Sequence, residues 1–183
     1  MQQVLNDRLQ GINLYLIGMM GAGKSTVGRM LARELGYGFV DTDNVLEKAA
    51  GKTINQLFAE EGEAAFRQLE SEVLAQVCAH KQLVIATGGG IVLRRDNWSY
   101  LHHGIIIWLD VAVEILYNRL AEDTTRPLLQ DTDPQGKLRS LLEQRQALYN
   151  QADLRITITQ EETSEQTITR IIEAIPSILK QPH

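Results

Sequence analysis

The sequence has a single cysteine, no long apolar run and no excess of basic residues. With only Cys78, an intramolecular disulfide is excluded, and its apolar neighbours at helical spacing favour a packing role. No stretch approaches the roughly 18 uninterrupted apolar residues of a membrane-spanning helix. The first residues have neither the basic start nor the apolar core of a signal peptide. We therefore expect a cytoplasmic protein with no membrane partner.

The charge balance and the length limit the partners and the number of domains that we expect. The 23 acidic residues outnumber 18 Lys and Arg, giving a formal net charge of −5 and a pI near 5.4. A nucleic-acid partner is not expected, because a phosphate backbone needs a basic surface. With 183 residues, of which 44% are hydrophobic, the chain is long enough to bury one good core and too short for two substantial domains.

The clearest motif is a glycine-rich segment near the N-terminus. Residues 18–26 read G-M-M-G-A-G-K-S-T, which matches G-x-x-x-x-G-K-[ST]. An apolar run of strand length (12–17) precedes it and a helical pattern follows, so its N–H groups are expected to face a polyphosphate at the start of a helix. Lys24 supplies charge for the phosphates, and the hydroxyl of Ser25 supplies a ligand for Mg²⁺. The loop predicts a nucleoside triphosphate but no particular reaction.

Two aspartates follow the second expected strand. The strand covers 38–40 and runs into Asp41-Thr42-Asp43. Ligands gather at the carboxyl ends of strands in open α/β sheets, so both carboxylates are expected near the phosphate-binding loop. One of them can instead cap the helix expected over 44–50. Alternate residues of an extended segment point to opposite sides, so the other aspartate remains available for chemistry.

The next two helices are expected over 53–60 and 62–79, and the second carries Arg67. Glu63 lies four residues before this arginine and Glu70 three residues after it. This is the spacing of ordinary surface ion pairs, which contribute about 0.3–0.5 kcal/mol each. Spacing alone therefore favours a solvated ion pair at Arg67 over a ligand-binding role.

Two further strand ends have alternative interpretations. The strand over 83–86 leads to three consecutive glycines, 88–90, which indicate either a close approach of backbone to ligand or a tight strand-to-helix turn. The strand over 105–109 is followed by Asp110, as in a magnesium-binding Walker B motif. Because a helix is expected to begin at once, we favour Asp110 as its N-cap residue.

The polar segment 121–134 lacks periodicity, and a polar loop of this length in a small domain is more often functional than idle. Arg126, its only basic residue, precedes Pro127 and is placed to move over a phosphate when the loop closes. A helix over 138–149, a strand over 154–159 and a closing helix over 166–179 complete the chain. Five strands separated by helices predict an α/β fold of three layers, with a five-stranded parallel sheet between helices.

In its motifs and their order the chain resembles the shikimate kinases, which belong to the nucleoside-monophosphate-kinase-like group of P-loop enzymes. The resemblance covers about residues 13–159. Beyond the P-loop it rests on D-T-D at 41–43, F-R-x-x-E at 66–70, G-G-G at 88–90, R-P-L at 126–128 and R-x-x-x-Y at 145–149. It implies a single kinase domain over 1–183, with a substrate-binding helical segment at about 42–80 and a lid at about 121–134.

The resemblance also implies the reaction and its residues. ATP phosphorylates the 3-hydroxyl of shikimate with Mg²⁺ present, and the enzyme is expected to be a monomer. The implied catalytic residues are Asp43, Lys24 and Arg126. The implied ATP-binding residues are Gly21, Ala22, Gly23, Lys24, Ser25, Thr26, Arg119, Arg126 and Pro127. The implied shikimate-binding residues are Asp43, Arg67, Gly89 and Arg145. Ser25 and, through water, Asp41 would hold the metal, and Glu70 would hold Arg67 in place.

The chemistry of shikimate agrees with this set. Two guanidinium groups suit its carboxylate, which overrides the surface-pair interpretation of Arg67. Arg119 lies late in a predicted helix, so complementing the helix C-terminus is its alternative role. Two other functions are considered: a kinase for another hydroxylated carboxylate, such as a gluconate kinase, and a non-catalytic nucleotide switch that binds a protein. The joint occurrence of D-T-D, F-R-x-x-E and G-G-G favours shikimate.

Overall fold

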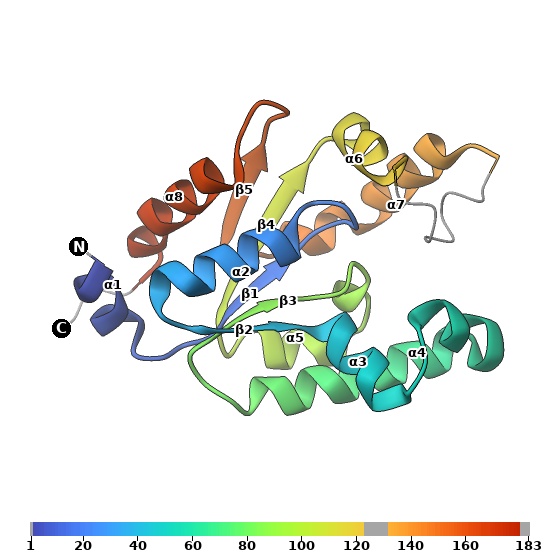
Figure 1. The fold of residues 1–183 in the computed structure, drawn as a ribbon, viewed down its shortest axis with the longest axis horizontal. Coiled ribbons are helices and arrows are strands. Elements are labelled where there is room, and N and C mark those ends of the chain that lie inside the picture. The colour runs from blue at the N-terminus through green and yellow to red at the C-terminus, as the bar shows by residue number, and fades with distance from the viewer. Residues whose placement is uncertain (1, 123–131, 180–183) are drawn as a thin grey trace.

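A five-stranded parallel sheet forms the centre of the computed structural model, which describes residues 2–122 and 132–179 (Figure 1). Its strands are β1 (Leu14–Ile17), β2 (Gly38–Asp41), β3 (Leu83–Ala86), β4 (Ile105–Val111) and β5 (Leu154–Ile158). They are ordered β2-β3-β1-β4-β5, so β1 is the central strand, and all four of its residues are buried. The predicted parallel sheet is confirmed.

Helices cover both faces of the sheet. They are α1 (Gln2–Leu9), α2 (Lys24–Leu35), α3 (Thr42–Ala50), α4 (Ile54–Cys78), α5 (Arg95–Leu101), α6 (Val113–Leu120), α7 (Pro134–Tyr149) and α8 (Ser164–Ala174), with short 3₁₀ turns η1 (Ile91–Leu93) and η3 (Ile175–Ser177). Helices α2 and α8 pack together on one side, and α4 and α5 on the other (Figure 1). This is the predicted three-layer α/β/α fold. No helix of the described residues is long and apolar enough to cross a membrane.

The helix boundaries agree with the predictions near residue 61 and differ at other points. The break expected between two helices near residue 61 is confirmed: Gly62, with φ 85° and ψ 172°, is non-helical and separates the two helical parts of α4. The polar N-terminal segment forms α1, and its Leu5 and Leu9 are buried in the core. The closing helix ends at Ala174, and Pro176 lies in the 3₁₀ turn that follows.

The prediction that Asp110 caps a helix was wrong. Strand β4 continues through this residue to Val111, and Ala112 occupies the N-cap position of α6 without a side-chain hydrogen bond. The carboxylate of Asp110 instead accepts hydrogen bonds from Nε (2.9 Å) and Nη2 (2.7 Å) of Arg155 on the neighbouring strand β5. This cross-strand ion pair keeps the side chain on the sheet and away from the helix start.

Candidate active site

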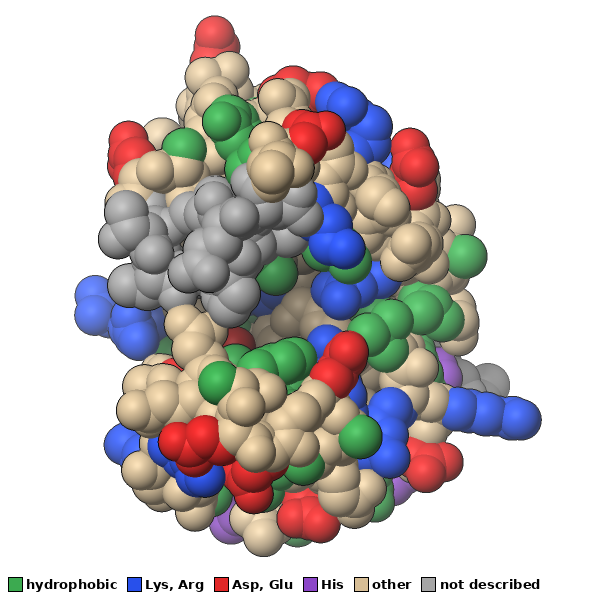
Figure 2. All heavy atoms as spheres, turned by 90° about the vertical axis from the view of Figure 1, so that its right-hand side faces the viewer, with side chains coloured by type: hydrophobic (Ala, Val, Ile, Leu, Met, Phe, Trp, Pro, Cys, Tyr) green, Lys and Arg blue, Asp and Glu red, His purple; other side chains and the backbone are tan. Residues whose placement is uncertain are grey.

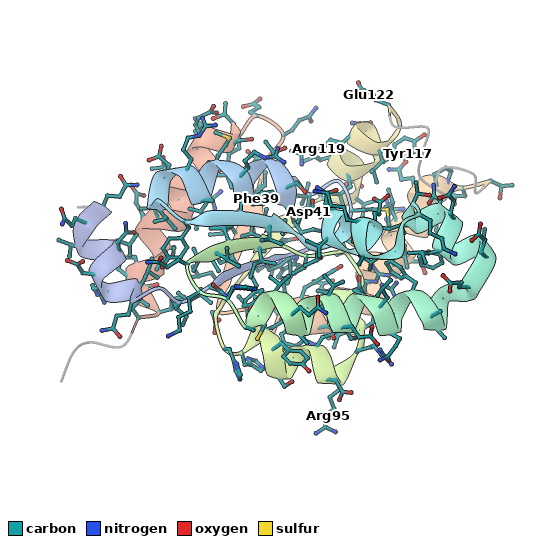
Figure 3. The ribbon with its side chains drawn as sticks, turned by 60° about the horizontal axis from the view of Figure 1, so that its bottom comes forward. Phe39, Asp41, Arg95, Tyr117, Arg119 and Glu122 are labelled. Carbon is teal, nitrogen blue, oxygen red and sulfur yellow. The ribbon has the colours of Figure 1, made fainter. Side chains whose placement is uncertain are left out.

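One large cavity, of about 1400 Å³, lies at the carboxyl ends of the strands. The phosphate-binding loop, α3, α4, the glycine turn after β3, α7 and the start of α8 all contribute to its wall. Figure 2 faces this end of the molecule and shows a hollow with Lys and Arg side chains on its wall. Figure 3 shows Asp41 and Arg119 near this end, whereas Arg95 projects away from it. Parallel strands bring these loops together because their carboxyl ends share one edge of the sheet.

The phosphate-binding loop connects the central strand to α2. Gly23 is the N-cap residue of α2, and its φ of 91° is a left-handed conformation that glycine adopts readily. The side chain of Lys24 lies along the loop, where Nζ donates to the carbonyl oxygens of Gly18 (2.5 Å) and Met19 (3.1 Å). Strand, loop and helix are therefore arranged as the sequence predicts, with a buried cation in the loop.

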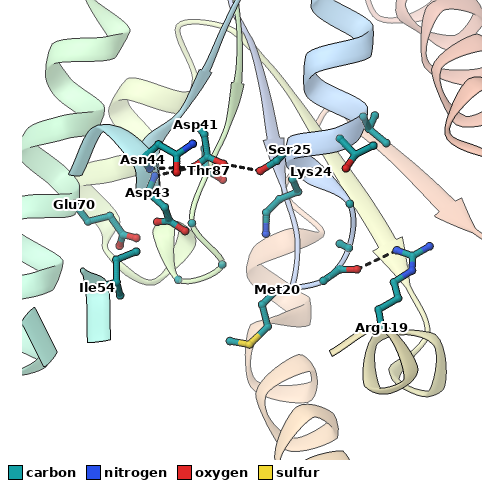
Figure 4. A pocket seen from close by; sticks show the side chains of 18 of the residues that line it. Met20, Lys24, Ser25, Asp41, Asp43, Asn44, Ile54, Glu70, Thr87 and Arg119 are labelled. Carbon is teal, nitrogen blue, oxygen red and sulfur yellow. Dashed lines mark hydrogen bonds between the residues drawn. The ribbon is translucent and has the colours of Figure 1, made fainter. Parts of the chain in front are cut away.

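Asp41 contacts both the phosphate-binding loop and the start of α3. Its Oδ1 caps α3 by accepting from the N–H groups of Asp43 (2.9 Å) and Asn44 (3.4 Å), and its Oδ2 accepts from Oγ of Ser25 (2.5 Å). Of the two aspartates, Asp41 is thus the cap, while Asp43 lies on the cavity wall. Figure 4 shows the side chains of Asp43 and Lys24 entering the same space.

Arg67 lies within a buried ion pair. Its Nη1 donates to Oε1 of Glu70 at 3.0 Å, and the two side chains are 16% and 1% exposed. Spacing alone favoured solvated surface pairs at Arg67, and for Glu70 this interpretation was wrong. It holds for Glu63, whose side chain is 65% exposed and lies 3.6 Å from Arg67. Burial raises the pKa of Glu70, and the charge of Arg67 opposes this shift.

The ion pair with Glu70 leaves two polar atoms without a hydrogen bond, although Nε of Arg67 faces Oε1 of Glu63 at 3.6 Å. Among the described residues, Nε of Arg67 and Oε2 of Glu70 are buried without a hydrogen-bond partner. Buried polar atoms without partners are uncommon, and beside a cavity they are available to a ligand or to ordered water.

The three consecutive glycines give these charged side chains room. A Cβ atom at Gly88 would lie 2.7 Å from Oε2 of Glu70 and 2.8 Å from Oδ1 of Asp43, and one at Gly90 would overlap the guanidinium group of Arg67. The segment is also a tight turn, because the N–H of Ile91 donates to the carbonyl of Gly88. The turn expected from the sequence is therefore confirmed, and the close approach that the glycines allow here is to charged side chains, while approach to a ligand stays a prediction.

Arg145 reaches the cavity from α7, near the glycine turn. Its side chain lies on the cavity wall, and the residue is only 8% exposed. A Cβ atom at Gly89 would lie 3.5 Å from Nη1 of Arg145, so the arginine and the glycine turn are neighbours. The structure thus brings Asp43, Arg67 and Arg145 to one cavity with Lys24.

Arg119 lines the cavity beside the phosphate-binding loop. Its Nη1 donates to the carbonyl of Gly21 at 3.0 Å, so this arginine contacts the phosphate-binding loop from the last turn of α6 (Figure 4). The predicted lid residues Arg126 and Pro127 lie outside the described residues.

Several residues on the cavity wall were not singled out from the sequence. Lys137 lies eight residues before Arg145 on α7, about 80° away around the helix axis, so helical spacing alone would not have indicated it. The residues at the far end belong to the segment around the start of α8: Ile158, Glu162, Ser164 and Thr167. Only the parallel topology indicates that they reach the cavity.

The geometry agrees with a comparison of sequences. A family model described as shikimate kinase matches residues 20–176. The chain belongs to the shikimate kinase family. It is 71% identical to the shikimate kinase of Trichormus variabilis, over 97% of this chain and 98% of that relative. It is 55% identical to the shikimate kinase of Thermosynechococcus vestitus, over 96% of each chain.

Solved structures of the family have the same fold. A shikimate kinase from Acinetobacter baumannii, in complex with shikimate, is 40% identical with a TM-score of 0.89, covering 94% of this chain and 97% of that one. A gluconokinase from Sinorhizobium meliloti is similar with a TM-score of 0.57 but only 14% identity, over 92% and 94% of the two chains, so it shares the fold alone.

Proposed function

We propose that this member of the shikimate kinase family transfers the γ-phosphoryl group of ATP to the 3-hydroxyl of shikimate, using the four side chains gathered around its main cavity. The observation that carries this proposal is that Lys24, Asp43, Arg67 and Arg145 line one space. A cation of the phosphate-binding loop therefore faces the same cavity as a carboxylate and two guanidinium groups. This arrangement accommodates a triphosphate and a hydroxylated acid next to each other.

On the acceptor side, Arg67 and Arg145 bind the carboxylate of shikimate. Their largely buried guanidinium groups suit a carboxylate because charge-assisted hydrogen bonds strengthen when water is excluded. Asp43 accepts the hydrogen bond of the 3-hydroxyl, orients this group toward the phosphate, and takes its proton late in the transfer. Gly89 offers a backbone N–H to the acceptor.

On the donor side, residues 21–26 hold the phosphates of ATP. Phosphoryl transfer needs alignment and neutralisation of charge more than covalent help. Lys24 leaves the loop carbonyls to bind the transferring phosphate, and Arg126 of the lid neutralises the same group. Arg119, with Pro127, lies beside the adenine. Closure of the lid over 121–134 excludes water and so limits hydrolysis of ATP.

The residues around Ser25 fit a magnesium ion. The Ser25 hydroxyl and the Asp41 carboxylate are hard oxygen donors held together at 2.5 Å next to the phosphate-binding loop. We propose that Ser25 binds the ion directly and Asp41 through water. When bound, Mg²⁺ supplies charge neutralisation and orientation of the phosphate oxygens.

The proposal includes the organisation and location of the enzyme. The chain is one kinase domain over 1–183, in which the segment 42–80 forms the acceptor side. It acts as a monomer, as the family resemblance implies. It works in the cytoplasm, where its donor ATP is available, and neither nucleic acid nor membrane takes part.

An acceptor panel tests the proposal. Purified protein with MgATP is assayed for ADP release with shikimate, with gluconate and with no acceptor. We expect rapid ADP release with shikimate and formation of shikimate 3-phosphate by mass spectrometry, with gluconate close to the blank. A gluconate rate that matches or exceeds that with shikimate would indicate the rival kinase. ATP turnover that shikimate does not change would contradict any acceptor at this site.

A further inference from the structure

Tyr149, the last residue of α7, contacts the acceptor side of the cavity from behind. It is fully buried, and its hydroxyl donates to the carbonyl oxygen of Gly89 at 2.7 Å. Its ring stacks against Trp108 of β4, with 5.7 Å between the ring centres. Tyr149 does not itself line the cavity.

This hydrogen bond fixes the orientation of a whole peptide group. The carbonyl of Gly89 and the N–H of Gly90 belong to one planar trans peptide, so they point in opposite directions. Because the carbonyl points to Tyr149, behind the cavity wall, the N–H of Gly90 points away from it, toward the cavity that Gly90 lines. A glycine turn without side chains has no other means of holding this orientation.

The rest of the turn is already paired. The N–H of Gly88 donates to Oγ1 of Thr42 at 3.1 Å, and its carbonyl accepts from Ile91 at 3.1 Å. In the described part of the chain, the N–H groups of Gly89 and Gly90 have no acceptor. These two donors are therefore the ones that the turn can present to an anion.

The same hydroxyl lies beside Arg145, one helical turn earlier on α7. Burial raises the pKa of Tyr149, while the charge of Arg145 and a hydrogen bond from its side chain lower it. The tyrosine hydroxyl thus donates to the carbonyl of Gly89, has Sδ of Met19 as a second, weak acceptor at 3.7 Å, and lies within reach of the charge of Arg145. The hydroxyl therefore lies between the glycine turn and Arg145, both of which are proposed to bind the acceptor.

We propose that Tyr149 is a positioning residue for the acceptor: its hydroxyl holds the Gly89–Gly90 peptide and the Arg145 guanidinium so that both face the carboxylate of shikimate. It does not touch the substrate and takes no part in the transfer itself. The inference deepens the proposed function and rests on it.

Tyr149→Phe removes the hydroxyl and keeps the ring, so the stacking on Trp108 remains. We expect the KM for shikimate to rise about fivefold, the change that one lost hydrogen bond of average strength produces. The KM for ATP should stay within twofold of the wild-type value, because the only contact of this hydroxyl with the phosphate-binding loop, among the described residues, is a weak one with Sδ of Met19 at 3.7 Å. The matched control is Tyr15→Phe, which removes a hydroxyl from an equally buried ring near the start of β1; it should leave both KM values unchanged.

Methyl shikimate distinguishes a loss of carboxylate recognition from a general loss of order in the site. The ester lacks the anionic carboxylate, so the wild-type enzyme should prefer shikimate strongly in kcat/KM, and Tyr149→Phe should reduce this preference about fivefold. The preference is a ratio measured on one preparation, so a partly folded variant does not alter it. A preference equal to that of the wild type, or KM values that rise equally for shikimate and ATP, would overturn the inference. Failure of the proposed function would appear earlier, as a wild-type enzyme that does not phosphorylate shikimate.

Discussion

Gly90→Ala should weaken shikimate binding by displacing Arg67, while leaving the fold nearly intact. The backbone of Gly90 has φ −94° and ψ 8°, which alanine adopts without strain. The added Cβ would overlap the Arg67 guanidinium, the far end of a flexible side chain. The arginine can therefore move, but only by giving up its position above the glycine turn.

The size of the effect follows from what Arg67 loses. A hydrogen bond between charged partners contributes about 1.5–3 kcal/mol. Loss of one such contact with the carboxylate of shikimate corresponds to a KM about 10- to 150-fold higher. Shikimate is varied at saturating MgATP in a coupled ADP-release assay, and thermal unfolding is followed in parallel. We expect a small change in Tm and an unchanged KM for ATP.

A double-mutant cycle identifies the cause. In an Arg67→Ala background the added methyl group has space, so Gly90→Ala should change the KM for shikimate by less than twofold further. Residues that act through one contact show such non-additivity. Two outcomes would contradict displacement of Arg67 as the cause. One is that the effects of the two substitutions on KM multiply, and the other is that Gly90→Ala alone leaves the KM for shikimate within twofold of wild type.

Two further predictions concern the carboxylates of the site. Asp43→Asn keeps the size of the side chain but removes its charge and basicity, so kcat should fall about 10²- to 10⁴-fold with Tm unchanged; a kcat near wild type would refute its role. Glu70→Gln tests the buried carboxyl. Because burial raises the pKa of Glu70 above its ordinary 4.5, the folded state holds the proton more tightly than the unfolded state. The stability that this group contributes is complete below pH 4.5 and is lost as the pH rises through the raised pKa. Glutamine does not titrate, so urea unfolding between pH 4 and 8 should show the variant gaining stability relative to wild type as pH rises, whereas parallel curves would contradict the shift.

The features that could be predicted from the sequence depend on residues that are close together in the sequence. The phosphate-binding loop is a contiguous motif between a strand and a helix, and periodicity identified all five strands and the layers around them. The family resemblance then named the acceptor residues that the structure brings to one cavity. Capping by one aspartate of D-T-D was also foreseen, since a cap acts within three residues of itself.

The features that were missed depend on partners far apart in the sequence. Asp110 was assigned to a helix start because its strand partner Arg155 lies 45 residues away and is adjacent only in the sheet. The ion pair of Arg67 was read as solvated, since helical spacing indicates which residues meet but not whether their face is buried. The hydroxyl of Tyr149 meets Gly89 across 60 residues. Each miss is a tertiary contact that local pattern does not encode.

The charges around the cavity bear on the proposed binding of MgATP and the proposed closure of the lid. Among its described lining residues, five are Lys or Arg (Lys24, Arg67, Arg119, Lys137 and Arg145) and five are Asp or Glu (Asp41, Asp43, Glu47, Glu70 and Glu162). A formally balanced wall does not by itself neutralise a triphosphate together with a carboxylate. The missing positive charge is what Mg²⁺ beside Ser25 and Arg126 of the proposed lid would supply, and both arrive with or after the nucleotide. If the proposed function holds, the acidic residues do more than hold the arginines: they limit the positive charge of the site before the nucleotide binds, so that full neutralisation of the transferring phosphate would require both the metal and the lid.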